Sequence, residues 1–245
     1  MKLSIIMPVY NEKNTIQKIV DQVSAVPIDK EIVIVDDGSR DGTREWIESR
    51  CQGRAGFKTL FHEKNLGKGS AIRAAIPVAT GDVLIIQDAD LEYDPQDFKK
   101  IMDQFTRPDV RVVYGTRFSQ VNKFLFVWHW FSNRFLGADY EIRYLHHFLG
   151  IQFLNFLANG LYGAGITDEA TCYKAFRKEV LQKLNLRCTG FEFCPEVTAK
   201  LRKAGYRIVE VPISYHPRSA KEGKKLSWRH GLQAIWTLLK YRFVD

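Results

Sequence analysis

The first half of the chain alternates short apolar runs with segments of helical periodicity, and this alternation restricts the fold more than any other feature. Five runs are typical of buried strands: 3–9, 31–37, 57–63, 82–90 and 111–118. Four segments between them have helical character: 14–26, 43–50, 69–79 and 95–105. Strands that alternate with helices predict right-handed βαβ units on a mostly parallel sheet. We therefore expect an α/β fold with flanking helices.

Polar side chains gather where these predicted strands end. They are Tyr10, Asn11, Glu12, Asp36, Asp37, Ser39, Asp88, Asp90 and Arg117. Open parallel sheets bind ligands at the carboxyl ends of their strands, so a site is expected there. The stretch QDADLEYDP places four carboxylates within seven residues, which packing alone does not explain because like charges repel.

The DAD triplet within that stretch has the geometry of a cation site. In an extended segment Asp88 and Asp90 project to the same side, with the small Ala89 between them. Two such carboxylates can hold Mg²⁺ or Mn²⁺ and leave positions open for phosphate oxygens. The alternative is a solvated acidic turn. Two other phosphate-binding classes are disfavoured, since no GxGxxG follows the first strand and GKGS at 67–70 lacks the first glycine of a P-loop.

The middle of the chain is aromatic. Residues 118–162 hold 13 of the 31 aromatic residues and only five Asp, Glu, Lys or Arg. The run FLFVWHWF is far shorter than the roughly 20 residues that span a bilayer. A helix is expected over 141–159, with a stripe formed by Ile142, Leu145, Leu149, Phe153 and Phe156. Two interpretations stay open: interfacial helices that dip into a membrane, or a buried core or dimer helix.

The last third carries the net charge. A strand is expected over 206–215, a cationic loop over 216–228 and a helix over 231–243. From residue 200 onward there are eleven Lys or Arg and three acids, so this stretch accounts for the whole formal charge of +8. Such a tail suggests an anionic partner: phosphates, a membrane surface or nucleic acid. No CxxC pair occurs among the four cysteines, which is typical of reduced thiols in a cytosolic protein.

Six motifs in order resemble the family 2 glycosyltransferases over nearly the whole chain. They are IIMPVYNE, IVIVDDGSRDGT, NLGKGSAIRAA, QDADLEYDP, ITDEATCYKAFRKEVL and GFEFCPEVTAKLRKAGYRIVEVPISYHPR. The resemblance implies a nucleotide-diphospho-sugar transferase (GT-A) fold with an aromatic interfacial helical insert. It also implies one catalytic domain over 1–245, with a nucleotide-binding half (1–117) and an acceptor-side half (118–245). The most similar subgroup resembles dolichol-phosphate mannose synthase and related polyprenyl-phosphate sugar transferases.

The resemblance also implies site residues. Those for the nucleotide-sugar are Pro8, Tyr10, Glu12, Asp37, Lys68, Asp88, Ala89, Asp90, Glu92, Arg218 and Lys224. Those for catalysis are Asp88, Asp90, Arg117, Asp168 and Arg218, with the metal on Asp88 and Asp90 and the acceptor phosphate on Arg117 and Arg143. Glu92 stands where the mannose synthases have Gln, which weakens the assignment to mannose.

The expected reaction is inverting, metal-dependent transfer of a sugar from a UDP- or GDP-sugar to a polyprenyl phosphate, at the cytoplasmic face of the membrane. The protein would be peripheral, would bind an anionic membrane surface but no nucleic acid, and could form a homo-oligomer. One alternative is an enzyme that extends a surface glycan through a sugar hydroxyl, with Asp168 as general base. With a phosphate acceptor, Asp168 would instead orient the site. The other alternative is a non-catalytic basic adaptor.

Overall fold

The computed structural model describes residues 1–118, 145–218 and 228–244. Two predicted site residues, Arg143 and Lys224, lie outside these ranges. The apolar run FLFVWHWF and the centre of the cationic loop do so too. Their roles therefore stay predictions from the sequence.

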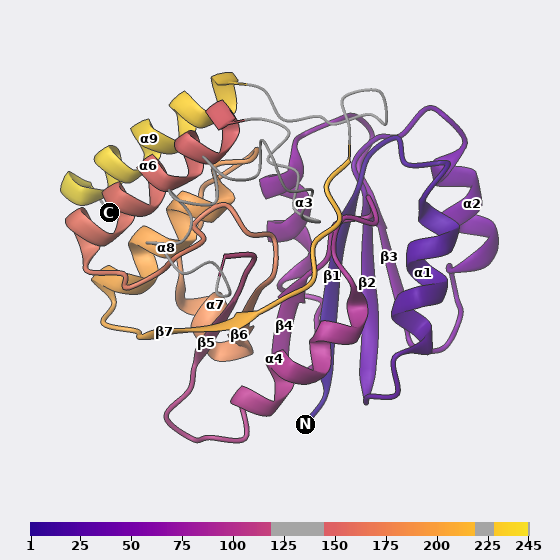
Figure 1. Ribbon diagram of the computed structural model, residues 1–245. Coiled ribbons are helices and arrows are strands. Elements are labelled where there is room, and N and C mark those ends of the chain that lie inside the picture. Colours follow the sequence, from indigo (N-terminus) through magenta and orange to yellow (C-terminus); the bar gives the residue numbers. More distant parts are fainter. Residues whose placement is uncertain (119–144, 219–227, 245) are drawn as a thin grey trace, which may run out of the picture.

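One mixed sheet organises the described residues (Figure 1). Its strands are β1 (Leu3–Val9), β2 (Lys30–Asp36), β3 (Phe57–Phe61), β4 (Val83–Ile86), β5 (Val112–Thr116), β6 (Lys174–Arg177) and β7 (Ile208–Pro212). They lie in the order β3-β2-β1-β4-β6-β5-β7. Of these seven, β6 alone runs antiparallel to its neighbours. The mostly parallel sheet expected from the alternation is confirmed.

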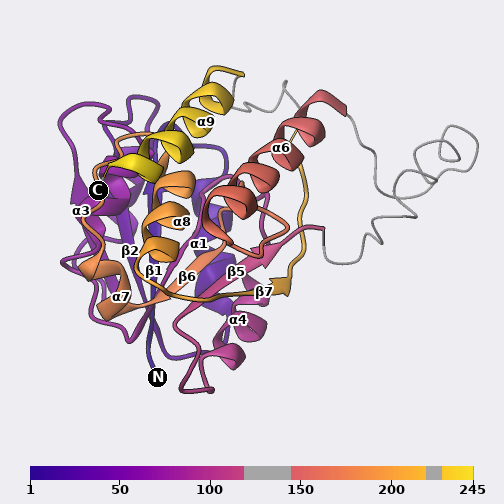
Figure 2. The same cartoon turned by 90° about the vertical axis from the view of Figure 1, so that its left-hand side faces the viewer.

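The helices follow the strands in chain order. In the first half they are α1 (Ile16–Ala25), α2 (Thr43–Arg50), α3 (Lys68–Ala75), the short 3₁₀ helix η1 (Pro95–Asp97) and α4 (Phe98–Gln104). In the second half they are α6 (Leu145–Tyr162), α7 (Lys178–Lys183), α8 (Phe193–Lys203) and α9 (Trp228–Phe243). Figure 2 shows α6, α8 and α9 as a group, and all three pack against one another.

Three elements were not expected from the sequence: β6, α7 and α8. The strand β6 has four residues, two of them Lys and Arg, so it carries no clear apolar alternation. It is buried because it pairs with β4 on one side and β5 on the other, and both partners are distant in sequence. The helix α8 does have a buried face, but Pro195 near its start hides the helical period.

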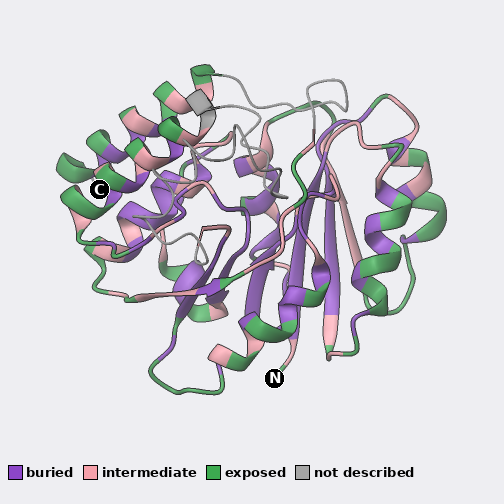
Figure 3. Ribbon diagram, in the orientation of Figure 1, coloured by how far each residue is buried: buried purple, intermediate pink, exposed green. Residues whose placement is uncertain are grey.

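The described part of the predicted stripe on α6 lies at the surface, whereas Ile142 and the side chain of Leu145 lie outside what the structure describes. Leu149, Phe153 and Phe156 are 56%, 47% and 70% exposed, while Ile151 and Ala158 on the opposite side are buried. The burial of this stripe in the protein's own core, one of the two alternatives, is therefore wrong. On α9 a second stripe is exposed, formed by Trp228, Leu232, Trp236, Leu239 and Phe243 (Figure 3). We call the two stripes together the apolar face.

Within the described ranges, the structure has no helix with the length and apolar character needed to cross a bilayer.

At the amino ends of the strands a buried carboxylate ties three segments together. Glu31 of β2 accepts hydrogen bonds from Ser4 Oγ at 2.6 Å, from Thr80 Oγ1 at 2.7 Å and from Lys2 Nζ at 3.1 Å. Burial alone would raise the pKa of Glu31, but these donors outweigh it and lower the pKa well below its usual value. This network lies at the other end of β1 and β2 from the residues predicted to form the site.

Replacing Glu31 should therefore cost stability without affecting ligand binding. Glu31→Gln should lower the free energy of unfolding by about 1–3 kcal/mol, because buried donors lose a charged acceptor. The pKa is depressed in the folded state, so the contribution of Glu31 is present above its unfolded pKa of about 4.3 and disappears as the pH falls. Urea titrations of both proteins at pH 7 and pH 4 measure this. The difference between them should shrink at pH 4, and a constant difference would contradict the assignment.

Candidate active site

The residues predicted to bind the nucleotide-sugar come together at the carboxyl ends of β1, β2 and β4. Backbone hydrogen bonds from Asp37 N to Val9 O and from Gln87 N to Ile6 O continue the strand pairing up to this edge. Beyond β4 the chain turns sharply, since Leu91 has a positive φ of 65°. The acidic stretch thus forms a turn at the edge of the sheet, which we call the acidic turn (Asp88–Asp94).

Lys68, the first residue of α3, faces the start of this turn. Its Nζ lies 2.6 Å from Asp88 Oδ1 and 3.6 Å from Cys172 Sγ. Burial disfavours its charge, but Asp88 more than compensates, and the pKa of Lys68 is raised well above its ordinary value. Lys68 is therefore a fixed cation at the position predicted from the sequence.

Arg218 faces three carboxylates from two segments. Its guanidinium nitrogens lie 3.0 Å from Asp90 Oδ2, 3.4 Å from Glu12 Oε2 and 3.8 Å from Glu92 Oε1. Burial and the neighbouring charges of Asp88 and Glu92 raise the pKa of Asp90 to about 7, although Arg218 lowers it. Four carboxylates thus face two cations, which leaves negative charge that a further cation would neutralise.

The acidic turn fits a divalent cation with oxygen ligands. Among the described residues no group of three or more His, Cys, Asp or Glu side chains is placed to hold a metal ion. Asp88 and Asp90 offer two carboxylates, and Mg²⁺ commonly takes one or two carboxylates together with substrate phosphates. These two residues would hold the ion, and the surplus charge on the turn favours it.

Asp37 is buried beneath the donor end of the site. Its carboxylate accepts from Leu66 N at 2.9 Å and from Gly67 N at 2.7 Å, and it lies 2.7 Å from His62 Nδ1. Gly67 has φ +95°, and a Cβ there would lie 2.3 Å from Thr189 O, so only glycine fits this loop. Because each carboxylate oxygen accepts two hydrogen bonds, Asp37 Oδ2 keeps capacity for one more donor.

Arg117 and Asp168 form a buried bidentate pair where β5 ends. Arg117 Nε and Nη2 each donate over 2.7 Å, and the backbone N of Arg117 also donates to Asp168 at 3.1 Å. Burial opposes the charge of Arg117, but Asp168 raises its pKa well above the usual value. Asp168 is fully buried, and both of its carboxylate oxygens accept hydrogen bonds from Arg117. This arrangement is suited to orienting Arg117.

A cavity of about 1020 Å³ connects these groups with the apolar face. At its polar end it is lined by Pro8, Tyr10, Glu12, Asp37, Lys68, Asp88, Ala89, Asp90, Glu92, Arg117 and Arg218. At its apolar end it is lined by side chains of α6, α8 and α9, among them Ile151, Leu154, Phe193 and Ile235. Phe153, Trp228 and Leu232 line the cavity and are also exposed on the apolar face, so the two are continuous.

The structure therefore places every described donor residue predicted from the sequence around one cavity. Arg117 lines it as well, whereas Asp168 does not. Sequence reasoning missed the cavity residues Tyr93, Phe191 and Tyr215. Tyr93 lies within the acidic motif and Tyr215 ends the predicted strand 206–215. The sequence around such a tyrosine does not indicate whether its ring lines a cavity or packs in the core.

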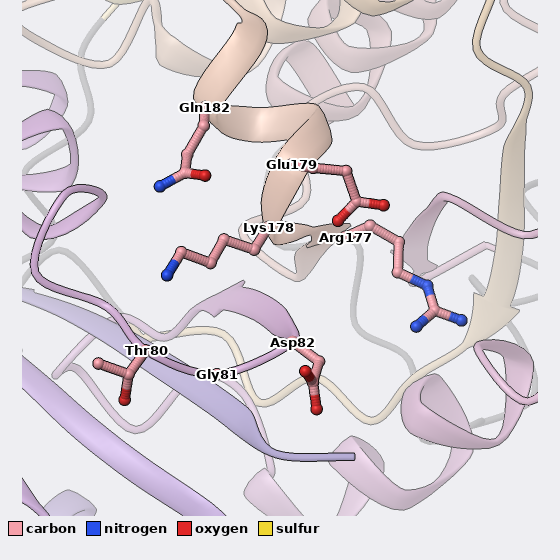
Figure 4. Close-up of a pocket in the computed structure, with 7 residues that line it drawn as sticks. All are labelled: Thr80, Gly81, Asp82, Arg177, Lys178, Glu179 and Gln182. Atoms are coloured by element: carbon pink, nitrogen blue, oxygen red, sulfur yellow. The ribbon is translucent and has the colours of Figure 1, made fainter.

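A second, smaller cavity of about 350 Å³ lies at the opposite end of β4 (Figure 4). The loop Thr80–Asp82 forms one side of it and the start of α7, with Arg177 and Lys178, forms the other. It is separated from the acidic turn by the length of β4, and no residue predicted for the site lines it.

Comparison with solved structures supports the fold. Glucosyl-3-phosphoglycerate synthase from Mycobacterium tuberculosis, in complex with Mn²⁺, uridine-diphosphate and glucosyl-3-phosphoglycerate, superposes with a TM-score of 0.70. The match covers 100% of this chain and 81% of that one at 17% identity. At this identity the likeness concerns the fold, which is the predicted GT-A fold.

Three curated proteins are similar in sequence. A low-salt glycan biosynthesis hexosyltransferase of Haloferax volcanii is 26% identical over 93% of this chain. The dolichol-phosphate mannosyltransferase of Pyrococcus furiosus is 27% identical over 98%, and the undecaprenyl-phosphate mannosyltransferase of Micrococcus luteus is 26% identical over 99%. The chain spans 52% and 64% of the length of the first two relatives and 99% of the third.

The model of the family described as "Glycosyl transferase family 2" matches residues 4–184, which include the acidic turn and the Arg117–Asp168 pair. A non-catalytic adaptor is thereby disfavoured, and the chain belongs to glycosyl transferase family 2 and has the GT-A fold.

Proposed function

We propose that this glycosyltransferase moves a sugar from a nucleotide-diphospho-sugar to a polyprenyl phosphate. The observation that carries the proposal is the continuity of one cavity with two chemically different ends. The acidic turn, Lys68 and Arg218 suit a diphosphate with its cation, and the apolar end suits a hydrocarbon chain. Two curated relatives are named as transferases to dolichol phosphate or undecaprenyl phosphate, which supports the same acceptor class.

The two halves of the chain would divide the substrates. Residues 1–117 would bind the donor, with the nucleoside over Pro8, Tyr10 and Asp37. Residues 118–245 would bind the acceptor, and Arg117, the last residue of the first half, would lie near its phosphate. The pair with Asp168 uses Nε and Nη2 of a guanidinium that has five N–H donors, so Arg117 retains donors for a phosphate oxygen.

The chemistry that follows is a direct displacement. An oxygen of the acceptor phosphate attacks the anomeric carbon, the bond from that carbon to the diphosphate breaks, and the nucleoside diphosphate leaves with inverted configuration at the sugar. The acceptor is already anionic, so no proton has to be removed and no general base is needed. Lys68 and Arg218 stabilise negative charge on the leaving diphosphate. A divalent ion bound to Asp88 and Asp90 would add electrostatic stabilisation of that charge.

We propose further that the apolar face contacts a membrane. The face combines exposed aromatic residues with Arg242 and Lys240 on the same helix α9. Apolar insertion and attraction to anionic lipid act together in peripheral binding. The cavity opens onto this face through Trp228 and Leu232, so an acceptor could enter from the lipid without crossing water. The experiment must distinguish membrane contact from a homo-oligomer formed through the same face. The cytoplasmic location stays a prediction.

Turnover should depend on a divalent metal ion held by the acidic turn. Asp88→Asn and Asp90→Asn should each lower turnover by about a hundredfold or more, because ligands that stabilise the leaving diphosphate are lost. Asp94→Asn is the matched control, since its carboxylate caps η1 by accepting from Gln96 N and faces no cation of the site. Initial rates with Mn²⁺, and after EDTA, test this. Wild-type rates in EDTA would refute the metal-dependent mechanism.

Sugar transfer should require a phosphate group on the acceptor. A labelled donor should mark a short polyprenyl phosphate and leave the matching polyprenol unmarked, since the alcohol has no base to activate it. Asp168→Asn should reduce transfer less than Asp88→Asn, when both are assayed well below their melting temperatures. That condition matters because Arg117 loses its buried partner, a change that typically costs about 3–5 kcal/mol. Labelling of saccharides alone would instead support the enzyme that uses a hydroxyl acceptor.

Membrane binding should depend on the apolar face. Trp236 and Phe243 are 65% and 85% exposed, so their replacement removes surface contact and leaves the core intact. Trp236→Ala with Phe243→Ala should weaken flotation with anionic liposomes at least on the order of tenfold. Leu66→Ala, which removes an exposed apolar side chain outside α6 and α9, is the control. An unchanged lipid fraction would count against the proposal, and a shift from dimer to monomer on gel filtration would favour a homo-oligomer.

A further inference from the structure

The short segment Ile213–Arg218 carries Arg218 to the site and itself belongs to no helix or strand. It follows β7, and an isolated bridge joins Tyr215 to Tyr93. Near its start, Ile213 N donates to Thr116 O of β5 at 3.1 Å and Ser214 N donates to Asp97 Oδ2 at 2.6 Å. The position of Arg218 therefore depends on side chains and turns rather than on regular structure.

Glu92 makes most of the contacts near the end of this segment. Its Oε2 accepts from Tyr215 OH at 2.9 Å, and its Oε1 accepts from the backbone N of Arg218 at 3.0 Å. Its backbone carbonyl accepts from His216 N at 2.8 Å. Glu92 is only 8% exposed, so these hydrogen bonds are largely shielded from water. One residue thus binds three of the last four residues of the segment.

The conformation of the acidic turn directs the Glu92 side chain toward the segment Ile213–Arg218. Leu91 adopts φ +65°, and Glu92 N donates to Asp90 Oδ1 at 3.1 Å. This local hydrogen bond reverses the chain, so that Asp90 and Glu92 meet the same guanidinium from one turn. Any movement of Glu92 would move the backbone of Arg218 relative to Asp90.

We propose that Glu92 is a positioning residue, which fastens the segment that bears Arg218 to the acidic turn and so fixes Arg218 where the donor diphosphate binds. This rests on the proposed donor. It assigns Glu92 a role toward this chain's own backbone, since both of its carboxylate oxygens already accept hydrogen bonds from the segment. The competing role is direct contact of Glu92 with a metal ion or sugar.

A double-mutant cycle separates the two roles. The proteins are wild type, Glu92→Ala, Arg218→Ala and the double variant, with Glu92→Gln as the conservative control. The measurements are the dissociation constants of UDP and GDP in the presence of Mn²⁺, that of Mn²⁺ alone, and the melting temperature. Whichever diphosphate binds wild type more tightly serves for the cycle.

Glu92→Ala should weaken nucleotide diphosphate binding by about tenfold, the effect of losing hydrogen bonds to a charged acceptor. In the Arg218→Ala background the same change should have almost no further effect, because Glu92 acts through Arg218. Glu92→Gln should stay within about threefold of wild type, since its carbonyl oxygen still accepts from Arg218 N. Binding of Mn²⁺ alone should be unaltered by Glu92→Gln.

Additive losses in the double variant would overturn the inference and assign Glu92 a contact of its own. Loss of Mn²⁺ binding in Glu92→Gln would make Glu92 a metal ligand and overturn it as well. A wild-type protein that binds neither UDP nor GDP would refute the proposed donor, and the inference with it. A fall in melting temperature without a change in nucleotide affinity would reduce Glu92 to a structural residue and likewise overturn it.

Discussion

Charge accumulates at one edge of the sheet, and the arrangement of the site depends on how that charge is balanced. Glu12, Asp88, Asp90 and Glu92 gather where β1 and β4 end, and water solvates them only in part because their side chains are 11–21% exposed. Lys68 and Arg218 supply two fixed positive charges. In the proposed mechanism a divalent cation would neutralise the remaining negative charge, and the same two basic residues would meet the diphosphate that such a cation accompanies.

This balance connects distant parts of the chain. Arg218 comes from the segment after β7 and reaches a turn more than 120 residues earlier in the sequence, at Asp90 and Glu92. Tyr215 links the same segment to Arg117, whose guanidinium lies 4.8 Å from the Tyr215 ring, and Arg117 is held by Asp168. The donor end and the acceptor side of the cavity are thereby joined through a short series of side chains. We therefore expect the energetic effects of substitutions at the two ends of the cavity to be non-additive.

Asp168 illustrates how burial decides between roles. The sequence makes it a general base if the acceptor is a sugar hydroxyl, and a residue that orients the site if the acceptor is a phosphate. In the structure it is fully buried, accepts three hydrogen bonds from Arg117 and does not line the cavity. A carboxylate that is buried, bound to Arg117 and outside the cavity lining is poorly placed to take a proton from a substrate, which favours the orienting role. The exposed stripe on α6 was resolved in the same manner, because Phe156 at 70% exposure excludes packing in the core.

The sequence alone determined the fold class and most of the predicted site residues that the structure gathers around one cavity. Both depend on local patterns: the strand and helix periods of the first half, and polar residues such as Asp37, Asp88 and Asp90 at strand ends, where a parallel sheet brings them together. Tertiary structure decided what depends on distant partners. The antiparallel place of β6 follows from pairing with β4 and β5, the restraint of Arg117 from Asp168, and the contacts of Glu92 from a segment over 120 residues away. Such contacts leave no period in the sequence, because they are set by packing across the chain rather than along it.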